Sequence, residues 1–296
     1  MAARPLVPQI AGEWWQIAGQ PDLGDLTGDA QEPVDFAVWQ AADTTWQLWS
    51  CIRKTKETGK TRLLYRWEGA DLLAPNWTPQ GIALRADPQC GETPGGLQAP
   101  YVFKDGETYF LFYGDWEHIC QATSRDGKQF TRVCDANGKT GLFGEGQDAN
   151  TRDPMALRVG DLWHCYYTAY PNRRGAVFAR TSTDLRHWGE AHIVNSGGKA
   201  GDGPFSAECP HVVAREGFFY LFRTERYGRD NLTHVYRSTD PLYFGRDEDA
   251  AYWITSLPIA APEIVSHAGQ DYLAALNPEL NGIRIARLQW LPADAS

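Results

Sequence analysis

A unit of about 55 residues recurs along the chain and constrains the fold more than any other feature. Each copy has a small or acidic residue before a proline, an apolar strand, a turn that contains glycine, and a second strand rich in aromatic residues. Four copies begin near residues 97, 151, 207 and 260, with prolines at Pro100, Pro154, Pro210 and Pro262. A fifth copy, from residue 33, has strands of the same length but Phe36 in place of proline.

Several copies continue into a third strand and a turn that combines Ser or Thr, Asp and a closing aromatic residue, as in residues 120–130, 178–188 and 235–244. Repeated meanders of short strands at this period are typical of a β-propeller. We therefore predict an all-β fold, a single five-bladed β-propeller over residues 33–296. Residues 1–32 are expected to form an N-terminal extension that packs on the propeller. An irregular β-sandwich would not explain the repeat.

The amino-acid composition limits the kinds of molecule that the protein is expected to bind. The 296 residues carry a net charge of -9 at pH 7 and 43% hydrophobic residues. The negative charge argues against nucleic acid, because phosphate binding requires a basic surface. Twelve Trp, 13 Tyr and 12 Phe suit strand cores and also the stacking of sugar rings on aromatic faces. No segment has membrane-spanning length or the pattern of a secretory signal. We expect no membrane partner and a cytoplasmic location, or secretion if a signal was removed; the oligomeric state stays open.

The six cysteines form no C-x-x-C pair, so neither a zinc site nor a redox motif is indicated. They lie mostly in apolar strands, which suits buried thiols. No cofactor and no bound metal are expected. His267, in the fifth copy, is the residue to inspect for a metal in the central channel.

Acidic residues recur where the first strand of a unit begins. In a propeller these strand starts from different blades converge on one end of the central channel. Three of the five starts carry Asp35, Asp153 and Glu208, and the other two carry Gln98 before Ala99 and Ala261 before Pro262. Carboxylates crowded into one pocket repel, so at least one is expected to hold a proton at neutral pH.

A proton donor beside an ionised carboxylate is the requirement of glycoside hydrolysis. We expect Glu208, on the longer side chain in an apolar run, to be the acid. Asp35 is expected to be the nucleophile or base. Asp153, next to Arg152, is expected to stay ionised and to bind sugar hydroxyls. An acidic structural rim is the alternative.

The segments "RDP" at 152–154 and "ECP" at 208–210 resemble motifs of the invertase and levansucrase-type glycoside hydrolases, families 32 and 68. The blade pattern also resembles the arabinanase and xylosidase-type family 43. The resemblance spans residues 33–290 and implies a glycosidase acting on a furanoside or pentoside, with Asp35 as nucleophile or base, Asp153 as transition-state stabiliser and Glu208 as acid/base. Two departures make the chain an outlying member: "PVDFAV" replaces the Asn-Asp-Pro-Asn stretch of invertases, and no residues remain for their second domain. The anomeric outcome depends on the separation of Asp35 and Glu208, about 5 Å for retention and about 6.5–9.5 Å for inversion.

Residues beyond the second strands are expected to line the pocket. Trp116 could stack on a sugar or pack at a blade edge, and Arg223 could hold Glu208 or Asp153 or bind a substrate carboxylate. Asp115, Tyr170, Gln98 and Arg152 complete the expected substrate-binding set. Trp14 and Trp15 are expected to pack on a blade or close the ring, or else to cap the pocket.

The leading interpretation is an exo-acting glycosidase on an oligosaccharide or simple glycoside. A transglycosylase or phosphorylase could use the same acid; a phosphorylase would also need a phosphate site, for which Arg223 and Arg226 are the only candidates. A non-catalytic sugar-binding propeller is the third possibility. A lectin would be expected to repeat one binding motif in every blade, whereas the strand starts here differ.

Overall fold

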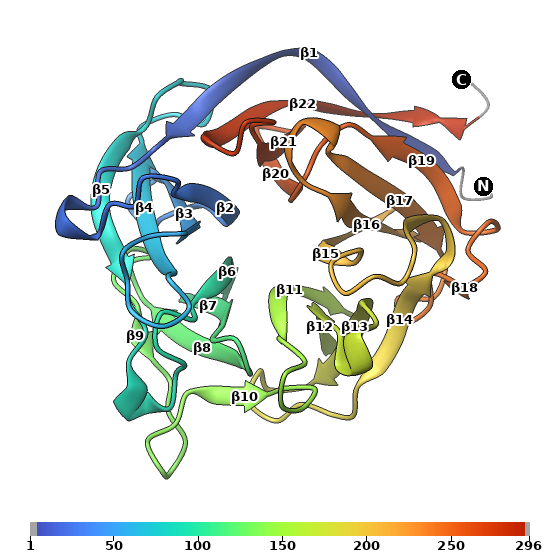
Figure 1. Ribbon diagram of the computed structural model, residues 1–296. Coiled ribbons are helices and arrows are strands. Elements are labelled where there is room, and N and C mark those ends of the chain that lie inside the picture. The colour runs from blue at the N-terminus through green and yellow to red at the C-terminus, as the bar shows by residue number, and fades with distance from the viewer. Residues whose placement is uncertain (1–4, 294–296) are drawn as a thin grey trace.

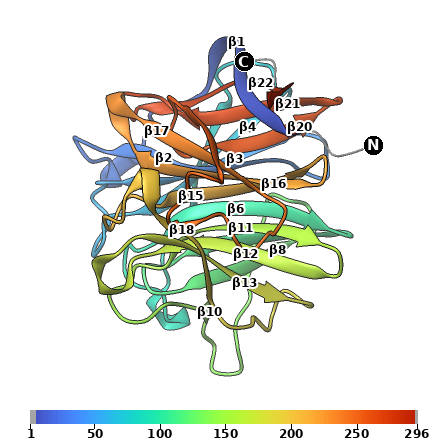
Figure 2. The ribbon, with the colours of Figure 1, turned by 90° about the vertical axis from the view of Figure 1, so that its right-hand side faces the viewer.

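The computed structural model describes residues 5–293 and contains five β-sheets arranged as blades around a central channel. Figure 1 views this ring along the channel, with the first strand of each blade innermost, and Figure 2 shows it from the side. The predicted all-β fold and five-bladed propeller are confirmed. The helical segments of the described residues are 3-10 turns of three residues each: η1 (Gly24–Leu26), η2 (Pro88–Cys90), η3 (Pro171–Arg173), η4 (Gly198–Ala200) and η5 (Gly228–Asp230).

Four of the blades follow in sequence order, each an antiparallel meander. The first contains β2 (Glu32–Gln40), β3 (Trp46–Arg53), β4 (Leu63–Gly69) and β5 (Thr78–Leu84). The second contains β6 (Gln98–Asp105), β7 (Thr108–Gly114), β8 (Ile119–Ser124) and β10 (Gly141–Phe143), with β9 (Thr131–Arg132) paired to β8. The third contains β11 (Arg152–Val159), β12 (Leu162–Ala169), β13 (Ala176–Ser182) and β14 (His192–Gly197). The fourth contains β15 (Glu208–Arg215), β16 (Phe218–Arg226), β17 (Leu232–Ser238) and β19 (Trp253–Leu257). The short β18 (Arg246–Asp247) pairs parallel to β14.

The fifth blade joins the two ends of the described chain. Its inner strands are β20 (Glu263–His267), β21 (Gln270–Leu276) and β22 (Gly282–Pro292), and β1 (Leu6–Gly19) pairs antiparallel with β22 as the outer strand. In Figure 1 the blue β1 runs beside the red β22. Trp15 lies edge-to-face on Tyr272, and the Arg284 guanidinium lies 4.2 Å from the Trp14 ring centre. Both tryptophans therefore pack on the fifth blade that β1 completes.

Aromatic side chains fill the space between the blades. Trp39 meets Trp49 at 5.9 Å between ring centres within the first blade, and Phe103 of the second blade meets Trp163 of the third at 4.9 Å. Burying rings of this size removes large apolar areas from water and adds favourable edge-to-face geometry. The aromatic second strand of each repeat thus holds the blades side by side, and this packing fixes where their inner strands begin.

Candidate active site

One backbone feature recurs where the inner strand of each blade begins. A non-glycine residue there has a left-handed φ between 37° and 55°, and the five residues are Asp35, Ala99, Asp153, Cys209 and Ala261. In the first four blades the pairing register shifts at this residue, which marks a β-bulge. Left-handed φ costs a non-glycine residue about 1–3 kcal/mol, and such strain is concentrated at functional sites. These five residues line the central channel together.

The bulge also explains the repeated proline. A proline has no N–H to donate, and within sheets it is tolerated at bulges and strand starts. Pro100, Pro154, Pro210 and Pro262 each follow the left-handed residue directly, and Phe36 takes the same place in the first blade. The motif that identified the repeat in the sequence is therefore the mark of the channel-facing residue before it.

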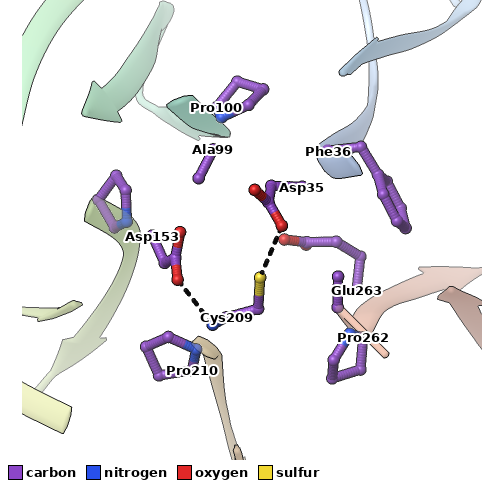
Figure 3. A pocket seen from close by; sticks show the side chains of 11 residues that line it. Asp35, Phe36, Ala99, Pro100, Asp153, Cys209, Pro210, Pro262 and Glu263 are labelled. Carbon is purple, nitrogen blue, oxygen red and sulfur yellow. Dashed lines mark hydrogen bonds between the residues drawn. The ribbon is translucent and has the colours of Figure 1, made fainter. Parts of the chain in front are cut away.

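These residues surround a small cavity of about 20 Å³ in the central channel. Figure 3 shows Asp35 and Asp153 on opposite sides of it, with Cys209 between them and Glu263 alongside. A cavity of this size has room for about one water molecule.

Glu208 is one residue out of register with the two aspartates. The residue that matches Asp35 and Asp153 in the fourth blade is Cys209, whereas Glu208 matches Arg152 of the third blade. The expectation that three carboxylates occupy matched positions is therefore wrong for Glu208. The glutamate still belongs to the cluster, because it pairs with Arg152 and its charge acts on Asp153.

Asp35 receives two side-chain donors on one oxygen. The Tyr227 hydroxyl donates to Asp35 Oδ1 at 2.8 Å, and the Cys209 thiol donates to the same atom at 3.2 Å. Burial and the nearby Asp35 carboxylate raise the pKa of Tyr227 well above its usual value, and burial raises that of Cys209. Both groups therefore keep their protons and remain donors at neutral pH.

Arg152 holds Glu208 from the adjacent blade. Its Nη2 forms a short contact to Glu208 Oε1, and its Nε donates to Oε2 at 3.3 Å. The Nη1 atom donates to the carbonyl of Asn150 at 2.9 Å, and the guanidinium lies 5.2 Å from the Tyr170 ring centre. Arg152 and Glu208 are 3% and 8% exposed, so this is a buried ion pair with further hydrogen bonds to the arginine.

Asp153 is the least compensated carboxyl group of the cluster. It is 4% exposed, its Oδ2 accepts from the Cys209 backbone N–H at 2.9 Å, and Arg152 Nε lies 3.8 Å from that oxygen. Burial raises the pKa of Asp153, the charges of Glu208 and Asp35 raise it further, and Arg152 offsets only part of the shift. This direction is opposite to the expectation that Asp153 stays ionised beside Arg152, and its cause is that the guanidinium is directed mainly to Glu208.

Two buried oxygens at the site have no hydrogen-bond partner among residues 5–293. They are Asp153 Oδ1 and Gln98 Oε1. The amide group of Gln98 donates to Asn150 Oδ1 at 3.0 Å, which fixes its orientation. Buried acceptors are normally satisfied, so an unsatisfied pair beside a pocket favours a ligand that brings hydroxyl donors.

The remaining expected substrate-binding residues lie away from this cluster. Arg223 is fully buried, and its guanidinium donates to Ser206, Asn195 and two glycine carbonyls. The hypothesis that it holds Glu208 or Asp153 is wrong, because its donors are directed to Asn195 and Gly197 of β14 and to Gly201 and Ser206 in the loop before β15. Asp115 accepts from the backbone N–H groups of Glu117 and His118.

The ring of Trp116 packs against two basic side chains. Lys60 and Arg62 place their charges 4.4 and 5.0 Å from its ring centre. Of the expected substrate-binding residues, the structure therefore places Arg152, Gln98 and Tyr170 near the carboxylates. Arg152 contacts Glu208 directly, and the other two are connected to the carboxylates through neighbouring residues.

A second carboxyl group lies in the same channel. Glu263 Oε2 is 3.5 Å from His211 Nδ1, and the backbone N–H of Ile264 reaches His211 Nε2 at 3.4 Å. Burial raises the pKa of Glu263 well above its usual value and lowers that of His211 to about 4. The two groups therefore form a neutral pair at neutral pH.

No group of three or more His, Cys, Asp or Glu residues in the described part of the chain could hold a metal ion. His267, the residue singled out in the sequence, packs edge-to-face on Trp46 at 5.3 Å. All six cysteines are free, and three of them, Cys51, Cys120 and Cys165, are buried. Over residues 5–293 there is also no helix of the length and apolar character needed to cross a membrane.

Three residues of the channel were missed by the sequence argument. Cys209 could have been found by aligning the bulge residue, the one before each proline, in place of the nearest carboxylate. Glu263 follows Pro262 and begins the inner strand of its blade, so it could have been included among the strand-start carboxylates. Tyr227 follows β16 outside the repeated pattern, and no sequence signal identifies it.

No family model matches the chain, and no curated protein matches it in sequence. Solved structures do match. An endo-arabinase from Bacteroides thetaiotaomicron has a TM-score of 0.65 at 11% identity, over 91% of this chain and 97% of that one. A thermostable family-43 glycoside hydrolase has 0.64 at 16%, over 89% and 91%. The family-32 β-fructofuranosidase of Bombyx mori has 0.62 at 16%, over 93% and 62%. At these identities the likeness shows the five-bladed propeller fold alone.

Proposed function

We propose that this protein is a glycoside hydrolase that removes a terminal furanose or pentose unit. One observation carries the proposal: three buried carboxyl groups from three blades lie together at the inner strand starts. Asp35 and Asp153 line the central pocket, and Glu208, next to the pocket residue Cys209, pairs with Arg152. Glycoside hydrolysis needs carboxyl groups in different protonation states, and Asp35, Asp153 and Glu208 have different partners. The structural neighbours are glycosidases, which supports the same reaction class.

In this proposal Asp35 is the nucleophile or the base that activates water. Its Oδ1 is held by Tyr227 and Cys209, and Figure 3 shows the other oxygen directed toward the open middle of the ring of bulges. A carboxylate held in one orientation loses little freedom as the reaction begins, which is the advantage of a preorganised group.

Glu208 is the proposed acid, and its proton is linked to Asp153. Without ligand, Arg152 is directed to Glu208 and Asp153 has the raised pKa. Sugar hydroxyls that donate to the free Oδ1 of Asp153 would favour its ionised form. Arg152 Nε is already 3.8 Å from Asp153, so a small movement would exchange its partners and leave the proton on Glu208. The proton would then go to the leaving oxygen.

A fructoside or an arabinoside is the first substrate to test; the Bombyx mori fructofuranosidase was solved, as a variant, with sucrose. The phosphorylase alternative has lost the support of Arg223, because this buried residue of β16 donates to Ser206 and Asn195 and not to the carboxylates.

The test is hydrolysis of fructosides, arabinosides, xylosides and galactosides by the wild type and by Glu208→Gln. We expect activity on one class, and a loss of about 10²–10⁴-fold in the variant. The loss should be smaller for aryl glycosides, whose leaving groups need less protonation. Glu145→Gln is the matched control, because Glu145 also binds an arginine, Arg180 at 2.8 Å, in a partly buried pair outside the pocket.

Equal activity of Glu208→Gln and wild type on every substrate would contradict the assignment of the acid. Sugar binding without turnover by the wild type would replace the hydrolase by a sugar-binding propeller. The anomer of the first product, followed by NMR, distinguishes retention from inversion.

A further inference from the structure

Tyr227 stands out among residues 5–293 as a phenol donating directly to one of the pocket aspartates. It follows β16 and packs against the core of the first, second and fifth blades, so its ring is anchored by apolar contacts. From there its hydroxyl reaches Asp35 Oδ1 at 2.8 Å, across 192 positions in the sequence. A donor held in this way orients the carboxylate without touching the ligand side of the pocket.

Cys209 makes the arrangement a closed triangle. Its sulfur lies 3.2 Å from Asp35 Oδ1 and 3.0 Å from the Tyr227 hydroxyl, and its backbone N–H donates to Asp153. Both donors reach Oδ1, and no hydrogen bond reaches Oδ2 within the part of the chain that the structure describes. The two oxygens of Asp35 are therefore not equivalent.

We infer that Tyr227, with Cys209, is the positioning residue of Asp35: the pair immobilises Oδ1 and leaves Oδ2 as the reacting oxygen. The inference rests on the proposed function for its catalytic meaning, but the contact itself can be tested without turnover. Hydrogen bonds to an ionised carboxylate favour that form, so removing one of the two donors should favour protonation of the carboxyl group.

Other groups also act on Asp35 and must be held constant in the test. They are Arg53 and Cys51 on β3, Asp153 on β11, Cys209 on β15 and Tyr227 itself. Arg53 is further held by Glu32, with its Nε 2.7 Å from Glu32 Oε2. Changing only the Tyr227 hydroxyl leaves the charges of Arg53 and Asp153 in place.

The direct experiment is a carboxyl titration. Protein labelled with ¹³C at aspartate carboxyl carbons is titrated by NMR, and the Asp35 signal is assigned by its loss in Asp35→Asn. In Tyr227→Phe we expect the Asp35 midpoint to move up by about one pH unit, the effect of one lost hydrogen bond to a charged group. An unchanged midpoint would overturn the inference, whether or not the protein hydrolyses any glycoside.

Kinetics give the second readout, on the substrate found active. Tyr227→Phe should lower kcat by about 10–100-fold with little change in KM, and the acidic limb of the pH profile should move to higher pH. Cys209→Ala should act in the same direction, and Cys209→Ser, which restores a donor, should recover most of the loss. A rise in KM with kcat unchanged would instead make Tyr227 a ligand-binding residue.

Tyr113→Phe is the matched control. Tyr113 is fully buried and donates to the Glu92 carboxylate at 2.6 Å within the second blade, so the variant loses the same kind of bond away from Asp35. It should lower stability by a similar amount and leave the Asp35 titration and the pH profile unchanged. A wild type without glycosidase activity, combined with a shifted Asp35 titration, would reject the proposed function and retain the positioning role.

Discussion

The channel contains two groups of acidic residues, and the free-energy cost of burying a carboxylate is offset differently in each. Around the pocket, Glu208 is paired with Arg152, and Asp35 accepts from Tyr227 and Cys209. Near His211, Glu263 has no cation or strong donor and its pKa is raised by burial alone. A buried carboxyl group either gains partners that favour its charge or gives the charge up. Glu263 nevertheless lines the same pocket as Asp35 and Asp153, so both arrangements meet in one part of the channel.

Asp153 lies between these two cases. It has one backbone donor, a distant guanidinium and two neighbouring carboxylates, and its pKa is raised. Burial is the main cause of this shift, the neighbouring carboxylates add to it, and Arg152, directed mainly to Glu208, offsets only part of it.

The largest expected difference between the regions is in activity. Asp35→Asn should lower kcat/KM by at least about 10³-fold on any glycoside the protein hydrolyses, because it removes the proposed nucleophile or base. Glu263→Gln should change it by less than about threefold, because a neutral amide replaces a neutral acid. Assays of both variants, with circular dichroism to confirm folding, test this. Equal losses would place Glu263 in the catalytic machinery.

The next effect concerns stability. Arg152→Met should cost about 3–5 kcal/mol in the free energy of unfolding, because it leaves Glu208 buried without its cation. Arg158→Met is the control, since that exposed residue lies 3.6 Å from Asp105 and its pair should contribute at most about 1 kcal/mol. Urea unfolding measures both. A loss below 1 kcal/mol for Arg152→Met would mean that Glu208 takes up a proton or water at little cost.

The smallest effect is a pH dependence at Glu263. A carboxyl group with a raised pKa in the folded state contributes stability that is complete below its unfolded pKa, about 4, and is lost as the pH rises through the folded value. Glu263→Gln does not titrate. The melting temperature of Glu263→Gln should therefore increase relative to that of the wild type as the pH rises from 4 to 8. The expected increase is about 2–4 °C for each kcal/mol of stability that the wild type loses. A constant difference across this range would show that Glu263 is already ionised.

The amino-acid sequence was sufficient to predict the ring of five blades, but not which side chains contact one another inside it. The proline repeat marks the bulges, so the five blades and the convergence of Asp35 and Asp153 could be inferred. The one-residue offset of Glu208 follows from aligning the residue before each proline, but not from aligning the nearest carboxylates, because a bulge changes which residue faces the channel without changing the repeat length. Arg223 lies within β16 and Tyr227 directly after it, yet Tyr227 reaches Asp35 and Arg223 reaches β14 and the loop before β15. That choice depends on side-chain direction, which the repeat does not encode.

The pairing of β1 with β22 has a consequence for how the molecule forms. Leu6 lies opposite Pro292 and Gly19 opposite Gly282, so the ring is closed by contacts between residues more than 260 positions apart. During synthesis from the N-terminus, β1 leaves the ribosome early and has no strand to pair with until β22 follows. Its edge stays open meanwhile, and closing so long a loop is slow. A chain that stops before β22 would thus have four complete blades, an unpaired first strand and no means of fixing the channel.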